Sequence, residues 1–177
     1  DLVVVAVRVP RHRELIVPAL EAGTMVFSEW PLAVDLAQAE ELARLAERHG
    51  GRTAVGLQAR SVPGVRYVRD LIAEGYVGEV LSTTLVGSGG GWGPVVGVGG
   101  AYTIDRANGA SLMTIPFGHT LDALTMCLTG FASVSATTAT RRPRVRVAET
   151  GEFLTMTAED QIAVTGELES GAVASLH

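Results

Sequence analysis

Apolar residues in the first third of the chain come in short runs separated by amphipathic stretches. Three of the runs have the length of buried strands, at residues 2–7, 25–28 and 53–57. Between them, two stretches carry apolar side chains at helical spacing, at residues 11–21 and 36–49. Strand, helix, strand, helix, strand at this spacing predicts a parallel, doubly wound sheet. This part of the chain therefore corresponds to half of such a sheet.

The second helical stretch is strongly amphipathic. Asp35 precedes it in the position of an N-cap residue. Its apolar face is expected to carry Leu36, Ala39, Leu42, Ala43 and Ala46, while charged residues point outward. We therefore expect this helix to pack against the parallel sheet.

Beyond residue 58 the pattern changes. Helices are predicted over 65–74 and 111–128, and an alternating segment at 79–86 predicts a strand. Further strand-like segments lie at 132–138, 161–167 and 172–176. Turn signals between them indicate a largely antiparallel sheet. The predicted fold class is therefore α/β, with a parallel sheet followed by an α+β domain.

The composition is that of a folded protein with a buried core. Hydrophobic residues make up 47% of the 177 residues, and the mean hydropathy is +0.28. No apolar run approaches the roughly 18 residues of a membrane-spanning helix. The net charge of −5 argues against a protein built to bind nucleic acid. Because the chain opens with Asp1 and stops at His177 in an apolar segment, we expect it to be a piece of a longer protein.

The inventory of reactive side chains is short. All 14 basic residues are arginines, so no lysine in this segment can act as an acid, a base or a Schiff-base former. Cys127 is the single cysteine, which excludes an internal disulfide and is compatible with a reducing compartment. We interpret it as a small core residue rather than a nucleophile. No set of metal ligands lies at convincing spacing.

The tripeptide Glu29-Trp30-Pro31 ends the second apolar run. We expect it at the carboxyl end of a parallel strand, where open α/β sheets hold their ligands. A lysine in the middle position could donate a proton to a substrate oxygen, whereas an indole has one N–H donor and no titratable proton near neutral pH. We predict a tight, fixed turn here, with a cis peptide before Pro31 as proline permits. Trp30 is then either a ring that stacks on a ligand or a core aromatic beside Pro31.

His119 and Asp122 stand three residues apart on a predicted helix, so they project from one face and can interact. A carboxylate in that position would orient the imidazole and keep it basic, which suits proton transfer to a hydroxyl or carbonyl. The alternative is that the pair is a structural feature of the helix start. The preceding Pro116-Phe117-Gly118 indicates a tight entry that aims His119 into a cleft. We expect Trp30 and His119 to lie in the same interdomain cleft.

Two other segments have the composition of anion-binding sites. The glycine-rich stretch 87–100 matches G-x-G-x-x-G at no register and has no helix directly behind it. We predict an irregular loop there, either a flap over a substrate site or a long surface loop. The arginines of 141–146 could contact phosphates, but in an acidic chain an exposed, alternating edge strand is favoured.

Five short motifs link this chain to a known family. They are Val9-Pro10-Arg11-His12, Glu29-Trp30-Pro31-Leu32-Ala33, Gly56-Leu57-Gln58-Ala59-Arg60, Glu74-Gly75-Tyr76-Val77-Gly78-Glu79 and Gly118-His119-Thr120-Leu121-Asp122. In this order they resemble the glucose–fructose oxidoreductase / inositol dehydrogenase (Gfo/Idh/MocA) family of two-domain NAD(P)-dependent enzymes. The resemblance implies that residues 1–58 are the C-terminal half of a Rossmann-type dinucleotide-binding domain. Residues 59–177 would be an incomplete substrate and oligomerisation domain with an open sheet.

The resemblance also implies roles for individual residues. The residues that it places beside NAD or NADP are Pro10, His12, Glu29, Trp30, Pro31, Gln58 and Arg60. It assigns the handling of the substrate hydroxyl to His119 and Asp122. The glycine turn that would hold the pyrophosphate is absent from this segment.

The chain departs from the family pattern at two positions. Trp30 replaces the family's lysine, and Ile115 replaces an aspartate that usually lies four residues before the histidine. Glu-Trp-Pro together with Ile-Pro-Phe-Gly-His is closer to the galactose-pathway repressor branch of the family. Proteins of that branch keep the dinucleotide-binding fold but act as regulators.

Two functions therefore remain open. The first is an NAD(P)-dependent oxidoreductase acting on or sensing a sugar, polyol or related hydroxy compound, with His119 as the acid–base group and without the lysine. The second is a non-catalytic, cofactor-dependent sensor or transcriptional co-regulator with a regulatory protein partner. General acid–base catalysis contributes about 10²–10⁴-fold to a rate, so losing the lysine argues against efficient turnover. For either function we expect a cytoplasmic homo-oligomer without direct nucleic-acid or membrane binding.

Overall fold

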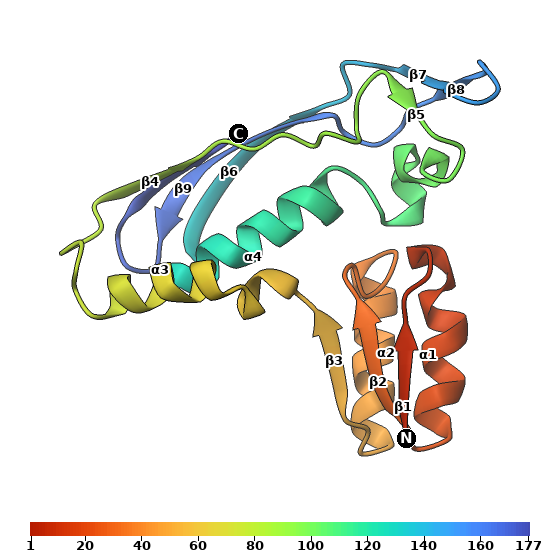
Figure 1. Cartoon of the computed structure of the whole chain (residues 1–177), viewed down its shortest axis with the longest axis horizontal. Helices are drawn as coiled ribbons and strands as arrows, with labels where there is room; N and C mark the ends of the chain where they lie inside the picture. Colours follow the sequence, from red (N-terminus) through yellow and green to blue (C-terminus); the bar gives the residue numbers. More distant parts are fainter.

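The computed structural model describes all 177 residues, in two parts joined at the end of the first sheet (Figure 1). The strands of the first part are β1 (Leu2–Val5), β2 (Met25–Glu29) and β3 (Thr53–Gly56), and its α-helices are α1 (His12–Glu21) and α2 (Leu36–Arg48). All three strands run parallel in the order β1-β2-β3. The alternating strand–helix pattern of the sequence is thus confirmed.

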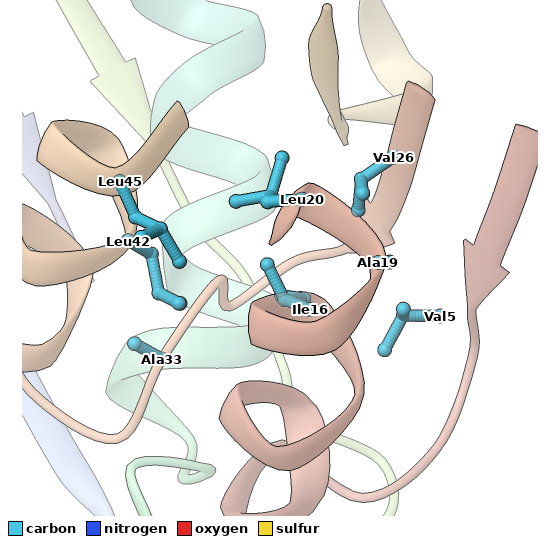
Figure 2. Close-up of a cluster of buried hydrophobic side chains, with 8 residues drawn as sticks. All are labelled: Val5, Ile16, Ala19, Leu20, Val26, Ala33, Leu42 and Leu45. Atoms are coloured by element: carbon cyan, nitrogen blue, oxygen red, sulfur yellow. The ribbon is translucent and has the colours of Figure 1, made fainter. Parts of the chain in front are cut away.

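The two helices cover one face of this sheet, and their contacts form the first core (Figure 2). Its buried members are Val5, Ile16, Ala19, Leu20, Val26, Ala33, Leu42 and Leu45. The expected cap is present, because the Asp35 carboxylate accepts a hydrogen bond from the Gln38 amide at 2.8 Å. Leu36 was expected on the apolar face of α2, but it is 73% exposed. Ala43, which was expected there too, is also exposed, and Leu45 is buried in the core instead. The buried face of α2 is centred on Leu42 and Leu45, whereas Leu36 and Ala43, seven residues apart, share a line rotated away from it.

The opposite face of the parallel sheet carries exposed apolar side chains. Leu2 and Val4 on β1 are 55% and 59% exposed, and Phe27 on β2 is 37% exposed. Register places Val4 directly beside Phe27. Parallel sheets are normally covered on both faces. The exposed apolar side chains therefore make this face resemble the buried face of such a sheet.

The second part contains a four-stranded sheet covered on one face by two helices (Figure 1). Its strands are β4 (Ser82–Leu85), β6 (Phe131–Ala139), β9 (Gln161–Leu168) and β10 (Val173–Leu176), and its α-helices are α3 (Pro63–Ala73) and α4 (Gly118–Cys127). The strand order is β4-β10-β9-β6, with only the β4–β10 pair parallel. The expected largely antiparallel sheet is therefore present.

A small third sheet extends beyond the end of the large one. It consists of β5 (Val95–Val96), β7 (Arg144–Val147) and β8 (Phe153–Thr155), in the order β5-β7-β8. Two predictions are corrected here. The glycine-rich stretch contains the strand β5, and β7 is the central strand rather than an edge, because β5 pairs with it across 51 residues of sequence. The alternation of exposed arginines and buried valines on β7 is confirmed.

Short helical segments connect these elements. Three 3-10 turns, η1 (Val9–Arg11), η3 (Ala101–Ile104) and η4 (Arg106–Asn108), lie in the loops, and a fourth, η2 (Gln58–Ser61), follows β3. A π-helical segment, η5 (Met113–Phe117), leads directly into α4. None of the helices combines the length and the apolar character needed to cross a lipid bilayer.

Candidate functional site between the two sheets

The carboxyl ends of β1, β2 and β3 point toward the second part of the chain, and the Glu29-Trp30-Pro31 turn follows β2 there (Figure 1). The Trp30–Pro31 peptide is cis, as the sequence analysis expected. Glu29 is exposed and Pro31 is buried. The turn therefore directs the half-buried Trp30 side chain away from its own sheet and toward η5.

The indole of Trp30 is held by the second part of the chain. Its Nε1–H donates a hydrogen bond to the carbonyl oxygen of Thr114 at 2.6 Å. Thr114 lies in η5, where Pro116 lacks an amide hydrogen and the Phe117 amide bonds to the Leu112 carbonyl five residues back. The only hydrogen-bond donor of the indole is therefore occupied by a main-chain acceptor.

Gly118 makes room for the indole. A Cβ atom added to Gly118 would lie 2.9 Å from Trp30 Nε1 and 3.4 Å from two carbons of the ring. The aromatic ring thus packs directly on the first residue of α4, and the next residue is His119. This contact brings Trp30 to the turn that carries His119, although the two residues are 89 positions apart in the sequence.

The expected hydrogen bond between His119 and Asp122 is absent. The Asp122 carboxylate instead accepts hydrogen bonds from Arg60, with Nε at 3.0 Å from both oxygens and Nη2 at 2.5 Å from Oδ1. The hydrogen bonds to Asp122 are the main cause that raises the pKa of Arg60 above its ordinary value, and the negative charge of Asp122 is the second cause. The side chain of Asp122 is only 11% exposed, so the carboxylate anchors η2 to α4. His119 is half-buried, and its imidazole makes no hydrogen bond within the chain.

Of the remaining residues predicted to contact the cofactor, two are exposed and one is buried. Pro10 and Gln58 are exposed near the carboxyl edge of the parallel sheet. His12 is buried, with 1% of its surface exposed. Its Nε2 lies 2.9 Å from the Val7 carbonyl and its Nδ1 lies 3.2 Å from the Leu32 carbonyl. In this structure His12 therefore ties two loops together.

Two further contacts join the same loops to the second part, and neither was predicted from the sequence. The Arg8 guanidinium carbon lies 5.1 Å from the centre of the Tyr102 ring. Gly109, at φ +64°, packs so closely on the main chain of Val34 that an added Cβ would lie 2.3 Å from its Cα. The one available sequence signal was Gly109 itself, since glycine tolerates both positive φ and close backbone approach.

The glycine-rich loop borders a cavity of about 560 Å³ next to α4. Polar groups of Thr120, Arg142, Asp160 and Gln161 line it, and Trp92 contributes an indole N–H that is buried without a hydrogen-bond partner. Trp30 and His119 do not line this cavity. A second, mostly apolar groove of about 860 Å³ lies between α3, α4 and β4.

No group of three or more histidine, cysteine, aspartate or glutamate side chains is arranged to hold a metal ion. Cys127 donates weakly to the Val65 carbonyl with a sulfur–oxygen distance of 3.6 Å. Burial raises the pKa of its thiol, which keeps it protonated and unreactive near neutral pH. Cys127 is only partly buried and lines the groove between α3, α4 and β4, so its interpretation as a core residue is corrected.

Both parts of the chain match models of known protein families. Residues 63–177 match the model described as "Gal80p, C-terminal domain", and residues 1–57 match the model described as "Oxidoreductase family, NAD-binding Rossmann fold". The chain therefore belongs to the Gfo/Idh/MocA oxidoreductase family, and within it to the Gal80-like branch. This agrees with the motif order in the sequence.

Individual relatives include an enzyme and a regulator. The dehydrogenase aclE of Aspergillus oryzae is 37% identical over 150 residues, covering 85% of this chain and 41% of that protein. The galactose/lactose metabolism regulatory protein GAL80 of Saccharomyces cerevisiae is 32% identical over 188 residues, covering 98% of this chain and 43% of its own length. A crystal structure of a super-repressor mutant of Gal80p from the same yeast has a TM-score of 0.92 at 30% identity, over 99% of this chain and 48% of that one. The chain thus spans less than half the length of these relatives.

Proposed function

We propose that the complete protein is an NAD(P)-dependent sensor of a sugar, polyol or related hydroxy compound. Binding of this ligand would change the affinity of the protein for a regulatory protein partner. The observation that carries the proposal is the hydrogen bond between the Trp30 indole and the Thr114 carbonyl. Trp30 stands at the position of the family's lysine, and its single donor is already bound to main chain. The residue therefore contributes shape and apolar area to the site rather than a proton.

The residues at the carboxyl edge of the parallel sheet fit a nicotinamide dinucleotide. Pro10, Glu29 and Gln58 are exposed there, and Trp30 offers an aromatic face beside them. When bound, the cofactor would supply hydride-transfer chemistry. Gln58 and Glu29 offer hydrogen-bonding groups to its amide or ribose, and Arg60 keeps η2 in place through Asp122. His12 would act indirectly, by holding the Val7 and Leu32 loops.

The second candidate function is a slow dehydrogenase. The observation that favours it is that His119 is half-buried and has no partner in the chain, so its imidazole is free to exchange a proton with a substrate hydroxyl. In this function Asp122 would not orient the imidazole, because Arg60 occupies the carboxylate. His119 would then act alone, and we expect a turnover about 10²–10⁴-fold below that of a site with an efficient acid–base partner.

For either function we propose a homo-oligomer formed through the outer face of the large sheet. Register places Ser133, Ser135 and Thr137 of β6 beside Glu167, Thr165 and Ala163 of β9 on this face. All six are exposed, and all but one are small and uncharged. Such a flat surface suits close packing against a second copy, because it carries few charges to desolvate.

The test uses the full-length protein. NADH and NADPH are titrated by fluorescence, and a panel of sugars and polyols is then added with the oxidised cofactor while reduced nicotinamide is followed by absorbance. The sensor predicts saturable cofactor binding without turnover in the wild type and in Trp30→Lys. Turnover that His119→Ala abolishes, and that the exposed control His49→Ala leaves intact, would establish the dehydrogenase instead. Absence of cofactor binding would reject both functions.

A further inference from the structure

Arg8 is an exposed cation at the carboxyl end of the parallel sheet. It lies between β1 and η1, and its guanidinium makes no ion pair and no hydrogen bond within the chain. The other arginines near this edge are neutralised by carboxylates: Arg11 pairs with Glu14, Arg13 with Glu41 and Arg60 with Asp122. Arg8 is therefore the one guanidinium at this end of the sheet whose charge is not neutralised.

The loop that carries Arg8 lies beside the loop that carries Trp30. Because β1 and β2 pair in parallel, the chain leaves both strands at the same end of the sheet. Beyond the strands, the buried His12 imidazole lies 2.9 Å from the Val7 carbonyl and 3.2 Å from the Leu32 carbonyl, which keeps the two loops together. Arg8 therefore borders the candidate site rather than a remote surface.

The second part of the chain orients the Arg8 side chain. The guanidinium carbon lies over the Tyr102 ring, 5.1 Å from its centre, and Tyr102 belongs to η3, in the green segment that faces the loop after β1 (Figure 1). Stacking on an aromatic face leaves the N–H groups on the rim of a guanidinium free to donate. Arg8 thus presents an oriented fork of donors without an acceptor, an arrangement suited to a carboxylate or a phosphate.

We propose that Arg8 binds the carboxylate of the small ligand, so that this ligand is a hydroxy acid, such as a sugar acid, rather than a neutral sugar or polyol. The inference rests on the proposed function and narrows its ligand class. A ligand carboxylate is favoured over the phosphates of the cofactor, because Tyr102 holds Arg8 against the part of the chain that also carries His119. A hydroxy acid carries both groups that these residues would recognise, a hydroxyl for the imidazole of His119 and a carboxylate for Arg8.

The experiment measures ligand binding to the full-length protein, saturated with NADH, by isothermal titration calorimetry. The probes are matched pairs in which a carboxylate replaces one primary alcohol: D-glucuronate with D-glucose, D-galacturonate with D-galactose, and D-gluconate with D-sorbitol. Arg8→Gln removes the charge and keeps most of the side chain. Its control is Arg52→Gln, since Arg52 is an exposed arginine without an ion pair at the amino end of the same sheet. Tyr102→Leu removes the aromatic ring, Tyr102→Phe retains it, and circular dichroism checks that each variant is folded.

We expect at least one acid to bind wild type about tenfold or more tightly than its neutral partner, and added salt to weaken it. Its dissociation constant should rise about tenfold or more in Arg8→Gln, while the affinity for NADH changes less than about twofold. Tyr102→Leu should weaken the acid about threefold, whereas Tyr102→Phe and Arg52→Gln should change its affinity less than about twofold.

Three results would overturn the inference and leave the proposed function standing, provided that NADH still binds. They are no binding of any acid, equal affinity for the acids and their neutral partners, and equal loss of acid binding in Arg8→Gln and Arg52→Gln. A loss of NADH affinity in Arg8→Gln without a loss of acid binding would also overturn it, in favour of a contact with the cofactor phosphates. Absence of NADH binding in wild type, read separately by fluorescence, would reject the proposed function and the inference together.

Discussion

Gly118→Ala tests whether the Trp30 indole is held where the structure places it. The backbone of Gly118, at φ −59° and ψ −46°, suits alanine. In a helix interior this change alone would stabilise the protein by up to about 1 kcal/mol. The new methyl group, however, would lie 2.9 Å from Trp30 Nε1, well inside van der Waals contact.

The steric cost is expected to exceed the helix propensity. Overpacking costs about 1–3 kcal/mol, and moving the indole also weakens its 2.6 Å hydrogen bond to Thr114, a contribution of about 0.5–1.5 kcal/mol. We therefore expect Gly118→Ala to lower the free energy of unfolding by about 1–2 kcal/mol. Urea denaturation followed by circular dichroism measures this change.

The matched control is the same substitution in a Trp30→Ala background. Without the ring, the methyl group introduced by Gly118→Ala has no clash, so the substitution should be neutral or stabilising there by up to about 1 kcal/mol. The double-mutant cycle then gives a coupling energy of about 1–3 kcal/mol between positions 30 and 118. If Gly118→Ala has the same effect in both backgrounds, the indole does not pack on α4 and the site geometry is wrong.

Three further predictions concern the framework around the site. Asp35→Ala should cost about 1 kcal/mol in urea denaturation by removing the cap of α2; an unchanged midpoint would contradict the capping role. Gly109→Ala should cost about 2–4 kcal/mol, because of its positive φ and its contact with Val34; a small change would show that this loop can shift freely. Arg13 donates hydrogen bonds to both oxygens of Glu41 and lowers the pKa of that carboxyl. Glu41→Gln removes the negative charge and one of these two acceptor oxygens. A carboxyl group whose pKa is lowered in the folded state stabilises the fold at pH values above its ordinary pKa of 4.5, and this stabilisation is lost as the pH falls through the lowered pKa. The difference in unfolding free energy between wild type and Glu41→Gln should therefore shrink on acidification. Added salt should reduce it as well.

Much of the fold could be predicted because its signals are local. Periodicity located β1, α1, β2, α2 and β3, since each strand or helix needs apolar residues at its own spacing to bury one face. The Asp35 cap is also a local feature, because its carboxylate accepts a hydrogen bond from an amide only three residues later. The motif order also identified the family that the comparisons support.

The site was predicted less completely because its contacts are long-range. The spacing of His119 and Asp122 allowed them to interact, yet Asp122 pairs with Arg60, which lies 62 residues earlier. An arginine fork offers that carboxylate two hydrogen bonds in good geometry, and no local pattern reveals which arginine will reach it. The same reasoning applies to β7, which became a central strand only because β5 pairs with it.

The sequence by itself determined the order of strands and helices in the parallel sheet, the presence of an amphipathic helix capped by Asp35, and that position 30 carries an indole without a titratable proton. Only the tertiary structure decided that the N–H of this indole is bound by the Thr114 carbonyl, that its ring fills the space left by Gly118, and that His12 is buried between two loops. The physical reason is range: hydrophobic periodicity acts between neighbours along the chain, whereas packing and hydrogen bonding at this site join residues that only the fold brings together.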